Sequence, residues 1–563
     1  MSVTPTRHSV VPSAPARGLA DLRQCGRDDL VSGFLVFLIA LPLCLGIAMA
    51  SGFPPTAGIV TAIVGGLLVS RLNGSHVTVN GPAAGLIVVV SAAVQNLGGG
   101  DAMAGYRYTL AAIVAASVLQ LALGLLKAGR LASFFPASVV HGMLAAIGII
   151  VMAKQVHVLV GVKPEAKDLI DTILAIPHSL MDPNPEVAAI GLSGLGILIG
   201  WSFLKNSWLR RVPAPLVVVL AGMALGQYFD LDHEHVYLFL PDDPILPHHE
   251  FTLGPKFLVA IPDNFLASFY FPDFGKCATH EFWGAAIGIC LVGSLESLLA
   301  AAAVDKLDPA RRCSDLNRDL AAVGLGNAIC GLVGGLPMIA EIVRSSANIG
   351  NGAKTGWANF FHGGFMLTFV ALFPGLIHEI PLASLAALLV FTGFRLASPR
   401  EFARTMEIGK EQLALFVITI LGVLATDLLV GVALGIAAKF VLHLLRGISP
   451  KNLFRIAYRV EKKDRDRYTI KVEGAAVFSN FLALKSETAA LPDGRKIVID
   501  LSDADLIDHT VMEFIHHFRH DYRRRGGHCH IHGLHNHDAV SPHPLAARRR
   551  RVSGRGKHKG RRP

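Results

Sequence analysis

Charged residues are scarce in this chain: Asp, Glu, Lys and Arg make up 17% of its 563 residues, and hydrophobic residues make up 52%. The mean hydropathy of +0.48 is far above that of a soluble protein of this length. Cysteine is sparse too, with seven residues and no CxxC pair, which excludes a zinc-finger spacing and a disulfide framework. No glycine-rich phosphate loop, HExxH motif or convincing catalytic triad occurs, so we expect neither an enzyme nor an ATP-driven pump.

Long apolar runs dominate the sequence instead. Many windows of about 20 residues are apolar enough to cross a bilayer, which predicts an α-helical, multi-pass membrane protein. We expect seven spans on each side of a polar stretch, at approximately 30–50, 57–69, a broken span from 77, 106–126, 137–160, 187–204 and 212–228, and then 282–303, 319–333, a half-helix near 343–358, 362–377, 381–394, 411–426 and 428–445.

The domain boundaries follow from changes in composition. We expect a loose cytoplasmic leader (1–27), a transmembrane domain (28–446), a small α/β domain (447–540) and a basic tail (541–563). Within the transmembrane domain, repeats at 28–228 and 281–446 flank an external loop at 229–280. Lys and Arg gather in alternate short loops, which predicts a cell inner (plasma) membrane protein with both termini in the cytoplasm.

The net charge of +10 comes almost entirely from the C-terminus. Nine Lys/Arg and no Asp/Glu occur in the last 23 residues, and the rest of the chain is close to neutral. A terminal run of one charge is typical of a disordered tail beside anionic lipid. We therefore expect a lipid bilayer partner and no nucleic acid, and removal of residues 542–563 is expected to leave transport intact.

One stretch, Gly334 to Asn359, combines apolar surroundings with Pro337, Glu341 and Arg344. A charge at the centre of a span costs ~2.5–3.5 kcal/mol on insertion scales, so it is rarely retained without a role. The order Gly-Gly-x-Pro, short extended piece and polar helix start predicts a broken helix. Its N-terminus, with a guanidinium beside it, would form an anion site. The alternative is a kinked spanning helix with one snorkelling arginine.

The first half of the chain contains a similar unit. Val77 to Asn80 alternates like a short strand, and Gly81-Pro82 then opens an apolar helix. Two such interruptions in corresponding places predict an inverted repeat with the substrate site between them.

Glu296 lies in the middle of a span with no basic residue within two helical turns. A carboxylate in such a place is expected to carry a proton or bind a cation during transport. The alternative is a structural carboxylate held by hydroxyls and backbone groups.

Several segments together resemble the sulfate-permease (SulP) anion transporters, related to the animal solute-carrier anion exchangers. They are VNGPAAGLIVVVSA, GSLESLLAAAAVD, SDLNRDLAAVGLGNAICGLVGGLP and IVRSSANIGNGAKT, and DLSDADLIDHT resembles the STAS domain of that family. The resemblance, from about Leu30 to Leu534, implies a seven-plus-seven inverted repeat with core and gate domains, elevator motion, a homodimer and no cofactor. By position it implies a substrate site of Leu43, Cys44, Gly81, Pro82, Ala83, Ala84, Val343, Arg344 and Ser345, with Glu296 as the coupling acid.

Three positions depart from the family pattern. Val343 stands where many members have serine, which removes one donor to the anion. Ala300 stands where sodium-coupled members have a hydroxyl, which favours proton symport over a sodium site. Glu341 stands where a small residue is common; we expect it either to pair with Arg344 or to belong to the site as a coupling residue beside Glu296. Two such acids leave a nucleobase or dicarboxylate carrier as the alternative substrate class.

We therefore expect a secondary transporter of a small inorganic anion, bicarbonate or sulfate. An uncoupled anion channel or membrane anion sensor is the alternative from another class, although a channel has little use for the acid at Glu296.

Two features of the α/β domain are weighed as sites. Thr510 falls where phosphorylatable STAS domains carry Ser or Thr, so it is a regulatory candidate, although a helix-capping role is the simpler interpretation. His528, His530 and His532 alternate on a predicted strand and share one face. A solvated face is favoured over zinc binding, and no metal site is predicted.

Overall fold

The computed structural model describes residues 18–129, 135–163, 169–204, 212–238, 250–262, 265–310, 312–464 and 467–551. These residues form two compact units. Unit one holds the described residues up to 129 and from 147 to 396, and unit two holds 135–146 and 397–551.

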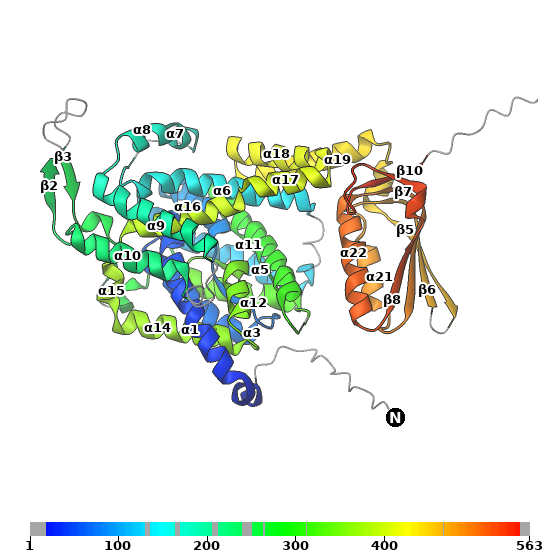
Figure 1. The fold of residues 1–563 in the computed structure, drawn as a ribbon, viewed down its shortest axis with the longest axis horizontal. Helices are drawn as coiled ribbons and strands as arrows, with labels where there is room; N and C mark the ends of the chain where they lie inside the picture. The colour runs from blue at the N-terminus through cyan, green and yellow to red at the C-terminus, as the bar shows by residue number, and fades with distance from the viewer. Residues whose placement is uncertain are drawn as a thin grey trace, which may run out of the picture. The chain divides into compact units, whose positions relative to one another are not determined.

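The first half of the chain forms the expected succession of apolar helices (Figure 1), and one short strand interrupts it. Its elements are α1 (Leu19–Ala50), α2 (Pro55–Val64) continued by a π-helical turn (Gly65–Val69) and α3 (Ser70–Leu72), β1 (Val79–Pro82), α4 (Ile87–Gly98), α5 (Ala102–Leu125), α6 (Ala137–Leu159), α9 (Pro185–Phe203) and α10 (Ala214–Tyr228).

The second half repeats this order. Its elements are α11 (His280–Leu307), α12 (Leu316–Val333), β4 (Met338–Glu341), α13 (Ile342–Gly350), α14 (Trp357–Leu372), α16 (Leu382–Leu396), α18 (Lys410–Ala425) and α19 (Leu428–Leu445). In each half the third segment is a strand followed by a short helix. Within the described residues, eight helices are long and apolar enough to cross a membrane. The fold is therefore a polytopic helical membrane domain, as the sequence predicts.

Shorter elements connect these helices. They are α7 (Leu169–Leu174), α8 (Ile176–Met181), α15 (Pro374–His378), α17 (Pro399–Ile408), α20 (Pro450–Phe454) and the hairpin of β2 (His235–Leu238) with β3 (Glu250–Leu253). The hairpin belongs to the segment expected as an external loop.

Side-chain caps set several helix starts. Asp101, Asp315 and Asp427 accept hydrogen bonds from backbone N–H groups in the first turns of α5, α12 and α19. The first N–H groups of a helix have no partner inside the helix, so a carboxylate there satisfies them and complements the helix dipole.

Two sequence-based boundaries in unit one are wrong. The leader is not loose up to residue 27, because α1 begins at Leu19; the Asp21 carboxylate accepts from the Gly18 N–H at 2.9 Å, and the Trp357 indole donates to the Gly18 carbonyl. The half-helix near 343–358 ends at Gly350, because the turn through Gly352 needs a φ of +93°, a left-handed conformation that glycine adopts readily. A separate helix, α14, then begins at Trp357.

Unit two contains the α/β domain (Figure 1). Its strands are β5 (Ala457–Asp464), β6 (Arg467–Ala476), β7 (Lys496–Ile507), β8 (His528–His532), β9 (His537–Ala539) and β10 (Arg548–Arg550), and its helices are α21 (Leu482–Ala490) and α22 (His509–Arg524). The sheet order is β5-β6-β7-β10-β9, and β8 pairs with β7 as well. Apolar residues of both helices pack with those of β6, β7 and β8 into one core, which gives the two-layer arrangement expected of a STAS-like domain.

The ordered domain extends beyond the predicted limit at residue 540. Residues 541–551 do not belong to a disordered tail, because β10 pairs with β7 and β9. β8 covers only Lys496–Asp500 of β7, so the far end of β7 keeps a free edge for β10. Main-chain hydrogen bonds form this pairing whatever the side chains are, so a basic composition is no obstacle to it. β5, α21 and β9 are further elements of the domain for which no prediction was made from the sequence.

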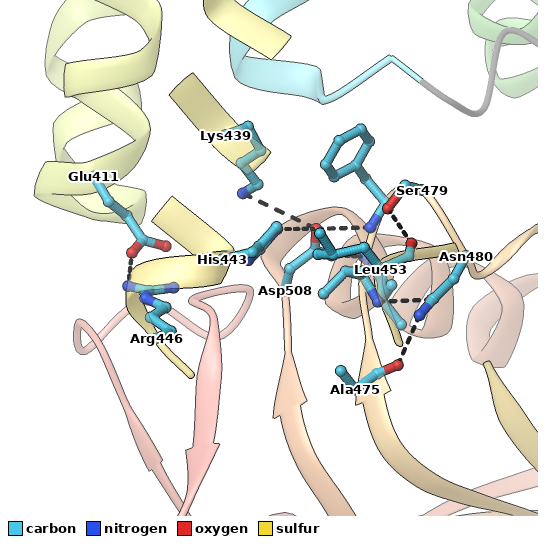
Figure 2. A network of polar contacts seen from close by, with 12 residues as sticks. Glu411, Lys439, His443, Arg446, Leu453, Ala475, Ser479, Asn480 and Asp508 are labelled. Atoms are coloured by element: carbon cyan, nitrogen blue, oxygen red, sulfur yellow. Dashed lines mark hydrogen bonds and ion pairs between the residues drawn. The ribbon is translucent and has the colours of Figure 1, made fainter. Parts of the chain in front are cut away.

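A buried polar network lies where α19 meets α22 within unit two (Figure 2). Asp508 is fully buried, and its carboxylate accepts from the N–H groups of Val511 and Phe478 at 2.9 Å each. From α19, Lys439 Nζ lies 4.0 Å and His443 Nε2 3.7 Å from the same carboxylate. Burial acts to raise the pKa of Asp508, but His443, the charge of Lys439 and the Val511 N–H together hold it below its usual value.

Candidate functional site

The two interrupted segments meet in an antiparallel ladder. Val79 pairs with Glu341 and Pro82 with Met338, although some 260 residues separate the strands. Each strand runs directly into a short helix, η2 (Ala84–Leu86) with α4 after β1 and α13 after β4, so the two helix starts lie at opposite ends of the ladder. The unpaired N–H groups of a helix start attract anions.

Neighbouring helices fasten this ladder at several points. The Ser297 hydroxyl of α11 accepts from Ala340 N–H at 3.1 Å, and the Asn327 amide of α12 bonds both backbone groups of Met338. Asn348 of α13 donates to the Val77 carbonyl and accepts from the Ser32 hydroxyl of α1. The ladder is therefore a rigid part of unit one.

Arg344 lies in the first turn of α13 with only 1% of the residue exposed. Its Nη2 donates to the Pro82 carbonyl at 2.9 Å, so the guanidinium reaches across to the end of β1. Its Nε and Nη1 have no hydrogen-bond partner among the described residues. A Cβ atom on Gly81 would lie 2.3 Å from Nη1, so the guanidinium occupies the space that the glycine leaves open.

Glu341 caps the helix that carries Arg344. Its Oε2 accepts from the Arg344 backbone N–H at 2.7 Å, and this is the bond that starts α13. From the sequence, Glu341 could pair with the arginine or face the substrate. In the structure its carboxylate contacts the arginine backbone.

Glu296 lies on α11 against the start of the helix that follows β1. A Cβ atom on Gly85 would lie 1.8 Å from Oε1, so the carboxylate packs directly on this glycine. The residue is 7% exposed, and Oε1 has no hydrogen-bond partner among the described residues. Unit one thus holds a buried acid at one half-helix and a buried guanidinium at the other.

The remaining expected site residues lie around these two. Cys44 of α1 is fully buried beside the Arg344 side chain, and Leu43 is half-buried. Ala83 is buried and Ala84 half-buried at the start of η2, whereas Val343 is 37% exposed in the first turn of α13. The structure therefore brings the residues of both segments together around the ladder.

Ser345 has a role that the sequence analysis did not foresee. Its hydroxyl accepts from Val79 N–H at 2.9 Å and donates to the Glu341 carbonyl at 2.5 Å. The side chain therefore fastens α13 to β1.

Two further residues at the site were missed. Gly85 carries a signal in the GPAAG sequence, but nothing local shows that Glu296 packs on it. His362 of α14 is fully buried, both its ring nitrogens lack a hydrogen-bond partner among the described residues, and it lies close enough to Arg344 to interact electrostatically.

The candidates in the α/β domain are placed as follows. Thr510 is half-buried in the first turn of α22, whose cap is Asp508. The imidazoles of His528, His530 and His532 lie on the exposed face of β8, as their spacing predicts. In the described ranges, no three His, Cys, Asp or Glu side chains are arranged to hold a metal ion.

The sequence is similar to those of known membrane transporters. Residues 27–419 match the model of the sulfate permease family. The putative sulfate transporter YvdB of Bacillus subtilis is 26% identical over 422 residues, which cover 75% of this chain and 74% of that protein. The bicarbonate transporter BicA of Synechocystis is 24% identical over 495 residues, which cover 85% of this chain and 83% of that protein.

Solved structures show the same fold. The transmembrane domain of a cyanobacterial bicarbonate transporter, BicA, matches with a TM-score of 0.60 at 22% identity, covering 76% of this chain and all of that one. Murine solute carrier 26 family member A9, an anion transporter in the inward-facing state, matches with a TM-score of 0.62 at 16% identity. The match covers 93% of this chain and 90% of that one. Because the family model covers well over half of its length, this chain belongs to the sulfate permease family of multi-pass membrane anion transporters.

Proposed function

We propose that the protein is a secondary active transporter of a small inorganic oxyanion, bicarbonate or sulfate. The observation that carries this proposal is the buried Arg344 guanidinium, whose Nε and Nη1 make no hydrogen bond to any residue that the structure describes. A buried charge with unmade hydrogen bonds is costly, and a bound oxyanion would offset that cost with charge-assisted bonds. The names of the relatives support the same two anions.

The ladder and its two half-helices would move as one body in an elevator-type cycle. The bonds to Ser297, Asn327 and Asn348 support this, because they tie β1, β4 and α13 into a single rigid part. We further propose a homodimer in the cell inner membrane with both termini in the cytoplasm, as the family resemblance and the loop charges indicate.

Proton coupling is proposed through Glu296. Its Oε1 lies buried and makes no hydrogen bond to the part of the chain that the structure describes, so the side chain can gain and lose a proton beside the anion site. Ala300, one turn later, is buried among Ala301 and Ala340 and supplies no side-chain oxygen for sodium. If a proton enters with the anion, the net charge carried falls by one, and uptake rises as the outside pH falls.

Uptake into proteoliposomes tests the proposed substrate and coupling. Labelled bicarbonate and sulfate are compared with fumarate and uracil under imposed proton and sodium gradients. We expect uptake of one of the two oxyanions, driven by protons and indifferent to sodium. Strict sodium dependence would replace proton coupling, and uptake of uracil or fumarate alone would replace the substrate class.

The Glu296→Gln variant isolates coupling from binding. Glutamine keeps the shape of the side chain and imitates the protonated acid. The variant is therefore expected to exchange external anion for internal anion, but a proton gradient should no longer drive accumulation of the anion. Glu281→Gln, in the first turn of the same helix and partly exposed, is the matched control and should retain accumulation. Proton-driven accumulation that survives in Glu296→Gln would remove this residue from coupling.

The alternative carriers fit the site less well. A nucleobase or dicarboxylate carrier with two substrate-facing acids would need Glu341, but that carboxylate caps α13. An uncoupled channel or sensor would leave Glu296 without a role.

A further inference from the structure

Unit two contains a cavity of about 500 Å³ that is separate from the ladder residues. It opens where three segments converge: the turn that follows α19, the end of β7 and strand β10. Four arginines contribute to its wall, together with one polar residue of the turn and one of α20 (Pro450–Phe454); they are Arg446, Arg549, Arg550, Arg551, Ser449 and Asn452.

The arginines of this cavity differ in their partners. Arg446 forms an ion pair with Glu411, Arg550 lies 3.3 Å from Asp503, and Arg551 lies 2.6 Å from Asp538. Asp505 contributes one acidic side chain to the wall, 3.9 Å from Arg550. The side chain of Arg549 makes no hydrogen bond or ion pair with any residue of the described chain, whereas its backbone is held in the sheet. The cavity therefore contains one unneutralised guanidinium.

A second guanidinium in the cavity wall, that of Arg446, also has an N–H group without a hydrogen-bond partner among the described residues. Nη1 of Arg446 is buried and makes no hydrogen bond within the described residues, although Nη2 contacts Glu411 (Figure 2). Burial and, after it, the positive charge of Arg549 lower the pKa of Arg446 from its usual value, so the two guanidinium groups are close enough to repel each other. The Ser449 hydroxyl, at the start of α20, makes no capping bond.

A multivalent oxyanion would neutralise the repulsion between Arg446 and Arg549. It would also accept hydrogen bonds from Nη1 of Arg446 and from the Ser449 hydroxyl. Arginine's planar fork matches phosphate, which accepts two parallel N–H bonds. The volume is sufficient for a phosphate ester and its substituent. We propose that this cavity binds a phosphate group.

The position of the cavity defines two sources for that group. Arg446 is the first residue after α19, one of the helices long and apolar enough to span the membrane. The cavity therefore begins where lipid headgroups lie, and it also borders the water-facing α/β domain. The phosphate belongs either to an anionic lipid or to a soluble phosphorylated compound.

Two binding measurements on the purified full chain distinguish these sources. Inorganic pyrophosphate is titrated by calorimetry into protein in detergent, and phosphatidylglycerol is compared with phosphatidylcholine for retention by native mass spectrometry. The test variant is Arg549→Gln. The matched control is Arg459→Gln, an exposed arginine of β5 that pairs with Glu473 and lies outside the cavity.

Arg549→Gln is expected to weaken pyrophosphate binding at least tenfold, or to abolish the preference for phosphatidylglycerol, while Arg459→Gln changes neither. The first result identifies a soluble ligand and the second a lipid. Arg549→Lys keeps the positive charge but lacks the planar guanidinium with its two parallel N–H donors. This variant should therefore bind the phosphate ligand more weakly than the unmodified protein and more tightly than Arg549→Gln. Absence of both kinds of binding, or equal losses in Arg549→Gln and Arg459→Gln, would overturn the proposal.

Discussion

Arg344 is the largest of the fully buried side chains in the described chain. Removing a guanidinium from water costs several kcal/mol, and within the described residues the Arg344 side chain makes one hydrogen bond, to the Pro82 carbonyl. A side chain retained only for stability would be fully satisfied. The N–H groups of Arg344 that make no bond indicate instead a ligand that binds and dissociates during transport.

Arg344→Ala is expected to weaken binding of the transported anion by ~1.5–3 kcal/mol, which is about ten- to a hundred-fold, because charge-assisted hydrogen bonds are lost. Calorimetry on folded, monodisperse protein measures this. Ser346→Ala is the control, since within the described residues the Ser346 hydroxyl donates only to the Ile342 carbonyl of the same helix. Unchanged affinity in Arg344→Ala would remove the arginine from the site.

Gly85 shows how closely the coupling acid is packed. An added methyl group would collide with the Glu296 carboxylate, and overpacking of this kind costs about 1–3 kcal/mol. We therefore expect Gly85→Ala to lower thermal stability and to impair transport. Gly284→Ala, on the helix of Glu296 but with open space around it, should be harmless.

A double-mutant cycle attributes the effect to this contact. Glu296→Ala removes the colliding carboxylate, so the double variant should recover most of the thermal stability that Gly85→Ala loses, without recovering proton coupling. Additive losses of stability in the double variant would show that the two residues do not interact.

At the level of elements, Asp508 connects α22 to α19. The same carboxylate caps α22 and lies beside Lys439, so its loss would leave a buried ammonium without compensation. Removing one partner of a buried pair costs ~3–5 kcal/mol. The contact thus explains why the domain and the last spanning helix fall in one compact unit.

The stability of unit two should depend on pH through Asp508. Its pKa is held below the usual value in the folded chain, so its contribution is complete above the unfolded pKa of about 3.9 and is lost as pH falls through the lower folded pKa. Thermal melts followed by circular dichroism at pH 3 to 7 should show this acid loss in the unmodified protein. Asp508→Asn should melt earlier at pH 7 and show a smaller acid loss. Asp493→Asn removes an exposed ion pair with Arg525 and is the control. If the melting temperature of Asp508→Asn falls with decreasing pH as steeply as that of the unmodified protein, Asp508 is not the source of the pH dependence.

At the scale of the whole molecule, the C-terminal extension belongs to the folded domain. Deleting 542–563 removes β10 and the Leu545 carbonyl that accepts from the buried His509. We therefore expect this truncation to lower the melting temperature, whereas the sequence alone predicts only that it leaves transport intact. Deleting 552–563 alone is the reference, and equal melting temperatures for the two truncations would show that residues 542–551 contribute nothing.

Much of the architecture follows from the sequence, because its signals are local. Apolar runs define the spans, and the strand-then-helix units are marked by Gly81-Pro82 and by the polar stretch around Arg344. Arg344 and Glu296 stand out because charge is rare in apolar surroundings. Where local signals were weak, the prediction failed: β10 consists of arginines, and α21 lies in a segment with little periodicity.

The sequence by itself determined that this is a polytopic membrane protein with two interrupted spans, a buried arginine and a buried acid, because hydropathy and helix-breaking residues act over a few turns. Only the tertiary structure decided how these parts meet. The β1–β4 register, the fit of Glu296 on Gly85 and the return of β10 to β7 each join residues distant in the chain. Such pairings depend on shape and on hydrogen-bond geometry between segments, and no single segment carries that information.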